Sequence, residues 1–149
     1  MELLIIGGDM RCAHLARLMD RRGMDVRAIG LEKALVPLDI CAGQDALEDA
    51  ECALLTQPFM QKDGMVFAPL SEKRIKLETV WQRLPRETKL LLIGAKGMPE
   101  DFERKAQVVD ILADEAFAQR NARPTAEGAI RAAMSELDST LSGNACLVI

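Results

Sequence analysis

Short apolar runs alternate with helical segments along most of this 149-residue chain, and this alternation predicts an α/β protein. The runs end at glycine or proline turns, as buried strands do. A helix between two such strands makes them parallel. We therefore predict an open, doubly wound, mostly parallel sheet of five strands, Rossmann-like or flavodoxin-like, with a long C-terminal interdomain helix. The predicted strands cover residues 2–6, 25–29, 52–56, 89–93 and 108–112.

The first two strands form a βαβ unit with the turn Gly7-Gly8-Asp9 and a helix over 10–22. A dinucleotide-binding turn needs Gly-x-Gly-x-x-Gly, and neither register of this turn supplies the later glycines. Glu32 follows the second strand, where an acid that binds ribose would lie. Asp9 is expected to cap the helix or, together with Arg11, to line a polar cleft.

Signals in the middle of the chain are weaker. Extended pieces are predicted at 36–40 and 65–68, and helical segments at 44–50, 77–84 and 99–107. Ligands of open α/β sheets bind beyond the carboxyl ends of the strands. That rule selects three rim segments, namely Gly7-Gly8-Asp9, Thr56-Gln57-Pro58 and Gly94-Ala95-Lys96-Gly97.

The last helix is expected to begin at Pro124 or Thr125 and to end at Gly143. It carries an apolar stripe at helical spacing: Ala126, Ile130, Met134, Leu137 and Leu141. Small residues beside the stripe would let another element approach closely. The apolar run 145–149 is predicted to be a buried strand that either returns to pair with this sheet or, as we favour, belongs to a further domain. The predicted organisation is therefore a domain over 1–122, a helix over 123–143 and the first strand of a second domain over 144–149.

Composition argues against several functions. A net charge of −4 and 3% aromatic residues disfavour a nucleic-acid platform. No apolar run reaches the roughly 20 residues that a membrane span needs. The four cysteines form no Cys-x-x-Cys pair and there is a single histidine, so we expect no metal site and reduced thiols in a cytoplasmic protein.

The sequence contains few groups of residues with the pattern of a catalytic site. His14 lies inside a predicted helix, where a lone histidine is more often structural, and there is no Gly-x-Ser-x-Gly elbow. Glu127 falls in the first turn of the predicted last helix, so it would be a helix-dipole partner. Alternatively, it would point into a cleft beside Thr125 and Asn121.

Two segments carry a resemblance to a known family. The run Asn121-Ala122-Arg123-Pro124-Thr125-Ala126-Glu127-Gly128 and the opening Ile6-Gly7-Gly8-Asp9-Met10-Arg11 resemble the family of dipicolinate synthase A subunits. The resemblance implies the N-terminal domain of a two-domain NAD(P)-dependent oxidoreductase. Such a protein forms dipicolinate from hydroxy-tetrahydrodipicolinate during sporulation, in the mother-cell cytoplasm. NADP(H) would be bound mainly by the missing C-terminal domain, so this fragment alone would be inactive.

The resemblance also implies partners and a site. The partners would be a small dicarboxylate substrate, the flavoprotein-like B subunit of dipicolinate synthase and a possible second copy of the chain. Arg11 and Asn121 would anchor carboxylates, Asp9 and Thr125 would be further substrate-binding residues, and Glu127 would be the catalytic residue, acting as a base. Two alternatives stay open: a non-catalytic dimerisation or partner-docking domain, and the N-terminal domain of a 2-hydroxyacid dehydrogenase-like enzyme.

Overall fold

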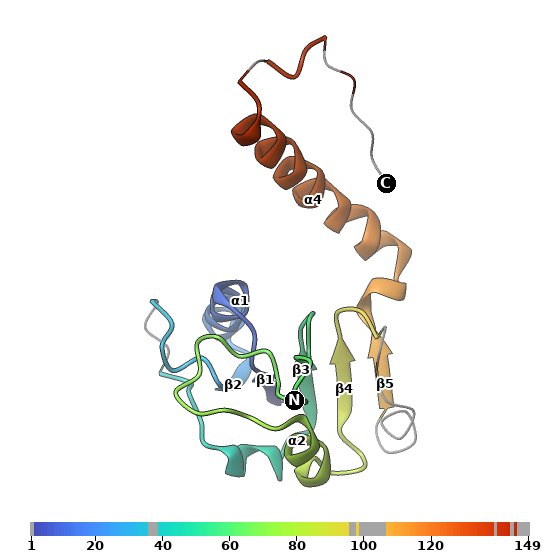
Figure 1. Cartoon of the computed structure of the whole chain (residues 1–149). Coiled ribbons are helices and arrows are strands. Elements are labelled where there is room, and N and C mark those ends of the chain that lie inside the picture. Colours follow the sequence, from blue (N-terminus) through green and yellow to red (C-terminus); the bar gives the residue numbers. More distant parts are fainter. Residues whose placement is uncertain are drawn as a thin grey trace. The chain divides into compact units, whose positions relative to one another are not determined.

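The computed structural model describes residues 2–35, 39–95, 98, 107–138, 140–143 and 145. The chain divides into two compact units, Met1–Ile111 and Leu112–Ile149. Figure 1 shows the first unit as a sheet with helices and the second as a long helix followed by irregular chain. Each unit is described by itself below.

The first unit is built on a parallel sheet with the strand order β2-β1-β3-β4-β5. The strands are β1 (Glu2–Ile6), β2 (Asp25–Ile29), β3 (Cys52–Leu55), β4 (Lys89–Leu92) and β5 (Gln107–Asp110). The prediction of a five-stranded parallel sheet of Rossmann-like type is confirmed. The observed bounds of each strand differ from the predicted ones by at most two residues at either end.

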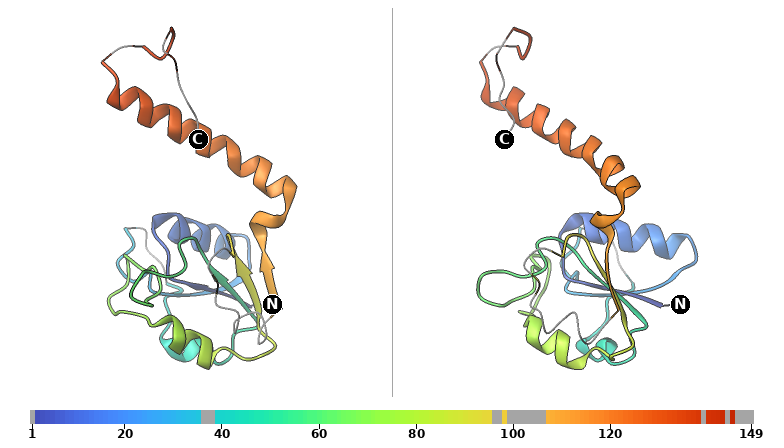
Figure 2. Two further views of the ribbon diagram at one scale, coloured as in Figure 1. Left: turned by 45° about the vertical axis from the view of Figure 1, so that its right-hand side comes forward. Right: turned by 90° about the vertical axis from the view of Figure 1, so that its right-hand side faces the viewer.

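Both faces of the sheet are covered, and the side chains of β1 show why. Leu3 and Ile5 pack with Cys12, Ala13 and Ala16 of α1 (Met10–Arg21). Their neighbours Leu4 and Ile6 point the other way, because successive strand side chains alternate between faces. Those two pack with a second cluster that includes residues of α2 (Leu77–Arg83) and of the short 3-10 turn η1 (Gln44–Leu47): Leu47, Leu77, Val80 and Trp81. Figure 2 shows α1 on one side of the sheet and α2 on the other.

This strand order reverses direction between β1 and β3. From β1 the chain moves out to β2 and then returns past β1 to β3, β4 and β5. In open α/β sheets the ligand crevice lies beside such a reversal, outside the carboxyl ends of the strands. The turn after β1 and the segment after β3 are therefore the first places to search for a site.

The second unit contains α4 (Glu115–Glu136), which is longer than predicted at its N-terminal end. The expected start at Pro124 or Thr125 is wrong because Asp114 caps the helix, its carboxylate accepting a hydrogen bond from Phe117 N at 2.7 Å. Pro124 lies inside the helix, where it lacks one backbone donor. The expected end at Gly143 is also wrong, because Leu137 already has an extended backbone. The division 1–122 and 123–143 stays a prediction.

Some predicted elements lie outside the described residues. These are most of the helix over 99–107, most of the extended piece over 36–40 and most of the strand over 145–149. Gln107, the last residue of that expected helix, opens β5 instead. The expected extended piece over 65–68 forms isolated bridges, Met60 with Val66 and Met65 with Lys76.

Candidate functional site

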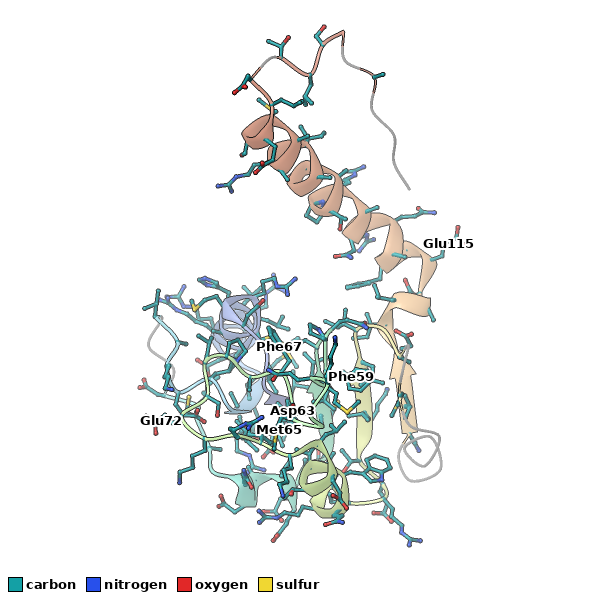
Figure 3. All side chains as sticks on the ribbon, in the orientation of Figure 1. Phe59, Asp63, Met65, Phe67, Glu72 and Glu115 are labelled. Carbon is teal, nitrogen blue, oxygen red and sulfur yellow. The ribbon has the colours of Figure 1, made fainter. Side chains whose placement is uncertain are left out.

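The carboxyl edge of the sheet brings together the described parts of the three predicted rim segments. Gly8 follows β1, Thr56 follows β3 and Gly94 follows β4. A chain segment over 59–68 contributes a further wall, with Phe67 N donating to Phe59 O at 3.2 Å across it. Figure 3 labels both phenylalanines on this segment. The edge is therefore built from three regions that are far apart in the sequence: the turn after β1, residues 56–68, and the turn after β4.

The glycine turn after β1 is closed by protein groups. Gly7 N donates to Ile29 O at 2.8 Å, and Gly8 N donates to Phe67 O at 2.7 Å. A Cβ on Gly7 would lie 2.6 Å from Val66 Cγ1. A phosphate at such a turn needs free backbone N–H groups. These two N–H groups already have partners, so the turn does not fit the pyrophosphate of a dinucleotide.

Glu32 also has its partners within the protein. Its Oε1 accepts from Gly30 N at 2.8 Å and its Oε2 from Glu72 N at 3.1 Å. Burial raises the pKa of this carboxyl, but its hydrogen bonds from backbone N–H groups and from the Ser71 side chain together outweigh burial, so the pKa is lowered. Both oxygens hold loop backbone in place. The carboxylate that could have bound a ribose is therefore a structural element of the loop over 70–72.

A cavity of about 480 Å³ adjoins Glu32 at the carboxyl end of β2. Its apolar lining includes Ile29, Ala42 and Ile75. Its polar lining consists of Glu32, Gln44, Ser71, Glu72 and Lys73, with Gly43 completing the wall. Ser71 Oγ donates to Lys73 O at 2.6 Å, so that hydroxyl is engaged by the loop itself. The wall of the cavity is therefore more polar than the mostly apolar wall typical of small-molecule sites.

Asp9 and Arg11 form one bidentate ion pair at the start of α1. The Asp9 carboxylate accepts from Arg11 N at 2.9 Å, which caps the helix as predicted. It also accepts from Arg11 Nε at 3.0 Å and from Nη2 at 2.9 Å. The side-chain hydrogen bond from Arg11 is the main reason that the pKa of Asp9 is lowered, and the same bond raises the pKa of Arg11.

The orientation of Arg11 leaves part of its guanidinium available. Its side chain is 80% exposed, although Asp9 holds one edge of the group. A guanidinium has five N–H donors, and a carboxylate engages only some of them. Arg11 can therefore be held in one orientation by Asp9 and still donate to an anion from solvent.

A second polar cluster joins β3, β4 and β5 at the same edge. Cys12 Sγ donates a hydrogen bond to Thr56 Oγ1 at 3.4 Å, and both side chains lie next to Gly8. The Asp110 carboxylate accepts from Gly94 N and Ala95 N, each at 3.0 Å. Sequence reasoning missed Asp110. The available signal was a lone acid directly after the apolar pair Val108-Val109, where a strand's carboxyl end meets the next loop.

Gln57 completes this cluster. With its amide nitrogen facing β4, it donates to Ile93 O at 2.7 Å and to Gly94 O at 3.1 Å. Gln57 and Asp110 thus fix the turn after β4 from two sides. In the described parts of the predicted rim segments, polar groups of these residues are engaged with one another and with Asp110.

The three remaining predicted site residues lie on α4. Asn121, Thr125 and Glu127 are all exposed. Thr125 Oγ1 donates to Asn121 O at 2.9 Å, so these two residues share one face of the helix. Residues two apart on a helix do not face each other, so Glu127 does not lie beside Thr125. The structure therefore brings Asp9 to Arg11 and Thr125 to Asn121, and it keeps Glu127 apart from the latter pair.

The helix-dipole interpretation of Glu127 is wrong. It assumed that Glu127 lies in the first helical turn, but α4 begins at Glu115. Dipole effects fall off within the first turn. Within the described part of the chain, the Glu127 carboxylate makes no hydrogen bond or ion pair.

Metal and membrane features were searched over the described residues only. They contain no group of three or more His, Cys, Asp and Glu side chains that could hold a metal ion. They also include no helix that is long and apolar enough to cross a membrane.

Comparison with known proteins gives the chain a family. Two solved structures confirm the fold. The A chain of dipicolinate synthase from Bacillus subtilis is 20% identical with a TM-score of 0.75, over 96% of this chain and 50% of that one. The A subunit of dipicolinate synthase from Bacillus halodurans is 20% identical with a TM-score of 0.76, over 93% and 50%.

This chain spans about half the length of those two structures. No curated protein matches it. The family model for the N-terminal domain of the dipicolinate synthase A subunit matches residues 2–111, which are most of the chain. The chain therefore belongs to the family of N-terminal domains of dipicolinate synthase A subunits.

Proposed function

We propose that this chain is the substrate-side domain of an oxidoreductase that forms dipicolinate from a hydroxylated tetrahydrodipicolinate during sporulation. The family match over residues 2–111 carries the proposal. The two solved structures with which it aligns are about twice as long. We assign the redox chemistry to the part of such a longer protein that lies outside this chain.

The glycine turn, whose N–H groups are already hydrogen-bonded, supports placing the redox chemistry outside this chain. Gly7 N and Gly8 N donate to protein carbonyls, and both Glu32 oxygens accept from backbone N–H groups. The protein groups at this turn that could contact the phosphates or ribose of NADP(H) are therefore already engaged within the protein. We therefore propose that NADP(H) is bound mainly by the C-terminal domain, and that the protein works in the cytoplasm with the B subunit of dipicolinate synthase.

Substrate binding is the role we propose for the Asp9–Arg11 pair. A ring dicarboxylate needs charged donors, and Arg11 presents an exposed guanidinium whose orientation is fixed by Asp9. Asn121 and Thr125, on α4, are proposed as further substrate contacts. Glu127 is proposed as the base that accepts a proton from the substrate, because its exposed carboxylate has no partner among the described residues.

The cofactor assignment is tested by calorimetry with NADPH. Residues 1–149 should show no binding at micromolar concentration, whereas the full-length protein serves as the positive control. Micromolar affinity of residues 1–149 would show that the nucleotide site lies in this domain.

The role of Arg11 is tested in the full-length enzyme with Arg11→Gln. Loss of a charge-assisted hydrogen bond of about 1.5–3 kcal/mol should raise KM for the dicarboxylate about 10- to 100-fold. Arg21→Gln is the matched control, because Arg21 is an exposed arginine in the last turn of the same helix. An unchanged KM for Arg11→Gln would remove Arg11 from the site.

Glu127→Gln tests the base. It should lower kcat by about 10²-fold or more, while unfolding free energy stays within about 0.5 kcal/mol because the side chain is exposed. Glu136→Gln, at the end of the same helix, is the control. Normal turnover in Glu127→Gln would exclude a catalytic role.

The alternative function is tested by offering simple 2-hydroxy acids to the full-length protein. Activity on them would favour a 2-hydroxyacid dehydrogenase-like enzyme.

A further inference from the structure

The exposed apolar face of α4 is the starting point. Ile130 is 52% exposed and Met134 is 62% exposed, and Leu137 at the helix end is 39% exposed. No residue of this 22-residue helix is buried. Helical spacing puts Ala126, Ile130, Met134 and Leu137 on one stripe. Helices in proteins gain most of their stability from packing such an apolar face against another element.

Charged residues follow one flank of this stripe in a self-complementary order. They are Arg120, Glu127, Arg131 and Asp138, with alternating signs and spacings of seven, four and seven residues. A further charge, Arg123, lies seven residues before Ile130 and therefore on the stripe itself. Arg120, Glu127 and Arg131 lie within α4, and Asp138 lies just beyond its end. All four are exposed, and within the described residues none of them makes an ion pair.

This order has a geometric consequence for two copies of α4. In an antiparallel pair related by a two-fold axis, residues on the same flank of each helix face each other. With the axis at Ala129, Glu127 of one copy lies opposite Arg131 of the other, and Arg120 lies opposite Asp138. Each of these four flank charges then lies at the level of its opposite, and each pair occurs twice, whereas Arg123 lies at the level of Ser135. In a parallel two-fold pair this flank would face the opposite flank of the partner helix, so these charges would not meet one another.

We propose that α4 is a dimerisation helix and that its occupant is a second copy of the same helix, packed antiparallel across Ala129 and Ile130. The apolar stripes cover each other, with Ile130 at the centre. Ala126, Ala129 and Ala133 are small, so the two helices can approach closely. This interface does not depend on the proposed reaction.

The apolar centre is tested by sedimentation equilibrium of residues 1–149 over a concentration series. The wild type should dimerise, and Ile130→Glu should weaken the dimer about 100-fold or more because it places two carboxylates at the centre of the interface. Ala132→Glu introduces the same side chain outside the stripe and should leave the dissociation constant within about threefold. A wild type that stays monomeric at high micromolar concentration, or a dimer that Ile130→Glu does not weaken, would overturn the proposal.

Charge swaps test the antiparallel register. Glu127→Arg and Arg131→Glu should each weaken the dimer about tenfold or more, since each replaces two attractive pairs by repulsive ones. The two single variants change net charge in opposite directions, so a general charge effect cannot explain both. The double variant should restore the wild-type dissociation constant to within about threefold. No recovery in the double variant would rule out this register, and helicity measured by circular dichroism shows that each variant is folded.

The same variants separate the interface from the catalytic role of Glu127. In the dimer the Glu127 carboxylate is paired with Arg131 of the second copy, so the two roles compete for one group. The double charge swap should restore dimerisation without restoring turnover if Glu127 is also the base. Recovery of both in the full-length enzyme would assign Glu127 to the interface alone.

Discussion

The sheet unit and α4 contain the same kinds of polar side chain but use them differently. In the sheet unit, Asp9, Glu32 and Asp110 each give both carboxylate oxygens to nearby donors. On α4, exposed charges such as Glu127 and Arg131 make no ion pair with any described residue. The apolar side chains follow the same division, since the sheet unit has a buried core and α4 has none.

This difference teaches where an external partner or ligand can be recognised. A carboxylate that already accepts two backbone N–H bonds positions a loop and has fewer lone pairs left for a ligand. An exposed side chain that has no partner in its own chain is free to make one elsewhere. Arg11 is the intermediate case, because Asp9 fixes its orientation while most of its surface stays in solvent.

The strongest test of the sheet unit is Gly8→Ala. Gly8 has a φ of +94°, and an added Cβ would collide with Sγ of Cys12 and lie 2.8 Å from its Cβ and 3.0 Å from Thr56 Oγ1. Backbone strain and overpacking together should lower the unfolding free energy by roughly 2–5 kcal/mol in urea titration. Gly23→Ala is the control, because Gly23 also has a positive φ of +78° but open space around it. Equal losses in the two variants would mean that strain alone, without the collision, explains the effect.

Asp110→Ala should have the next largest effect. It leaves Gly94 N and Ala95 N without their acceptor, which costs about 1–3 kcal/mol of unfolding free energy. Asp110→Asn keeps one acceptor oxygen and should lose about half as much. Amide hydrogen exchange at residues 94 and 95 should quicken in both variants. Unchanged exchange there would show that Asp110 does not hold this turn.

A glycine-to-alanine substitution on α4 should change stability in the opposite direction, that is, raise it. Gly128 lies within the helix, and an added Cβ would meet nothing within 4 Å. Gly128→Ala should therefore raise helix stability by up to about 1 kcal/mol through the higher helix propensity of alanine. Thermal unfolding followed by circular dichroism measures it. A loss of stability would mean that this position is in close contact with another element.

The smallest effect concerns pH and the Asp9–Arg11 pair. Arg11 lowers the pKa of Asp9 in the folded state, so the pair stabilises the fold above the unfolded pKa of about 3.9 and this contribution is lost as pH falls through the lower folded pKa. Asp9→Asn keeps a capping oxygen and removes the charge. Urea midpoints of wild type and Asp9→Asn should differ slightly at pH 7 and converge near pH 2. A difference that persists in acid would point to the cap rather than the charge.

The local sequence determined the elements of the sheet unit. Apolar runs such as Leu3–Ile6 indicate strands to within a residue or two, because a short unbroken apolar run that ends at a glycine turn is typical of a strand buried on both faces. The same reasoning identified Asp9 as a helix cap and excluded the dinucleotide fingerprint. It failed at α4, because Pro124 was taken as a helix start while the stronger signal, the capping residue Asp114, lies ten residues earlier.

Only the tertiary structure decided how the polar residues are used. Glu32 and Glu72, or Gly94 and Asp110, are far apart in the sequence, so no local pattern could show that one supplies the acceptor for the other's backbone. The closure of the glycine turn by Phe67 is likewise a long-range contact, made because the loop over 59–68 returns across the carboxyl edge of the sheet. Sequence pattern depends on helix and strand periodicity, whereas the partner of a buried N–H group depends on which distant segments the fold brings together.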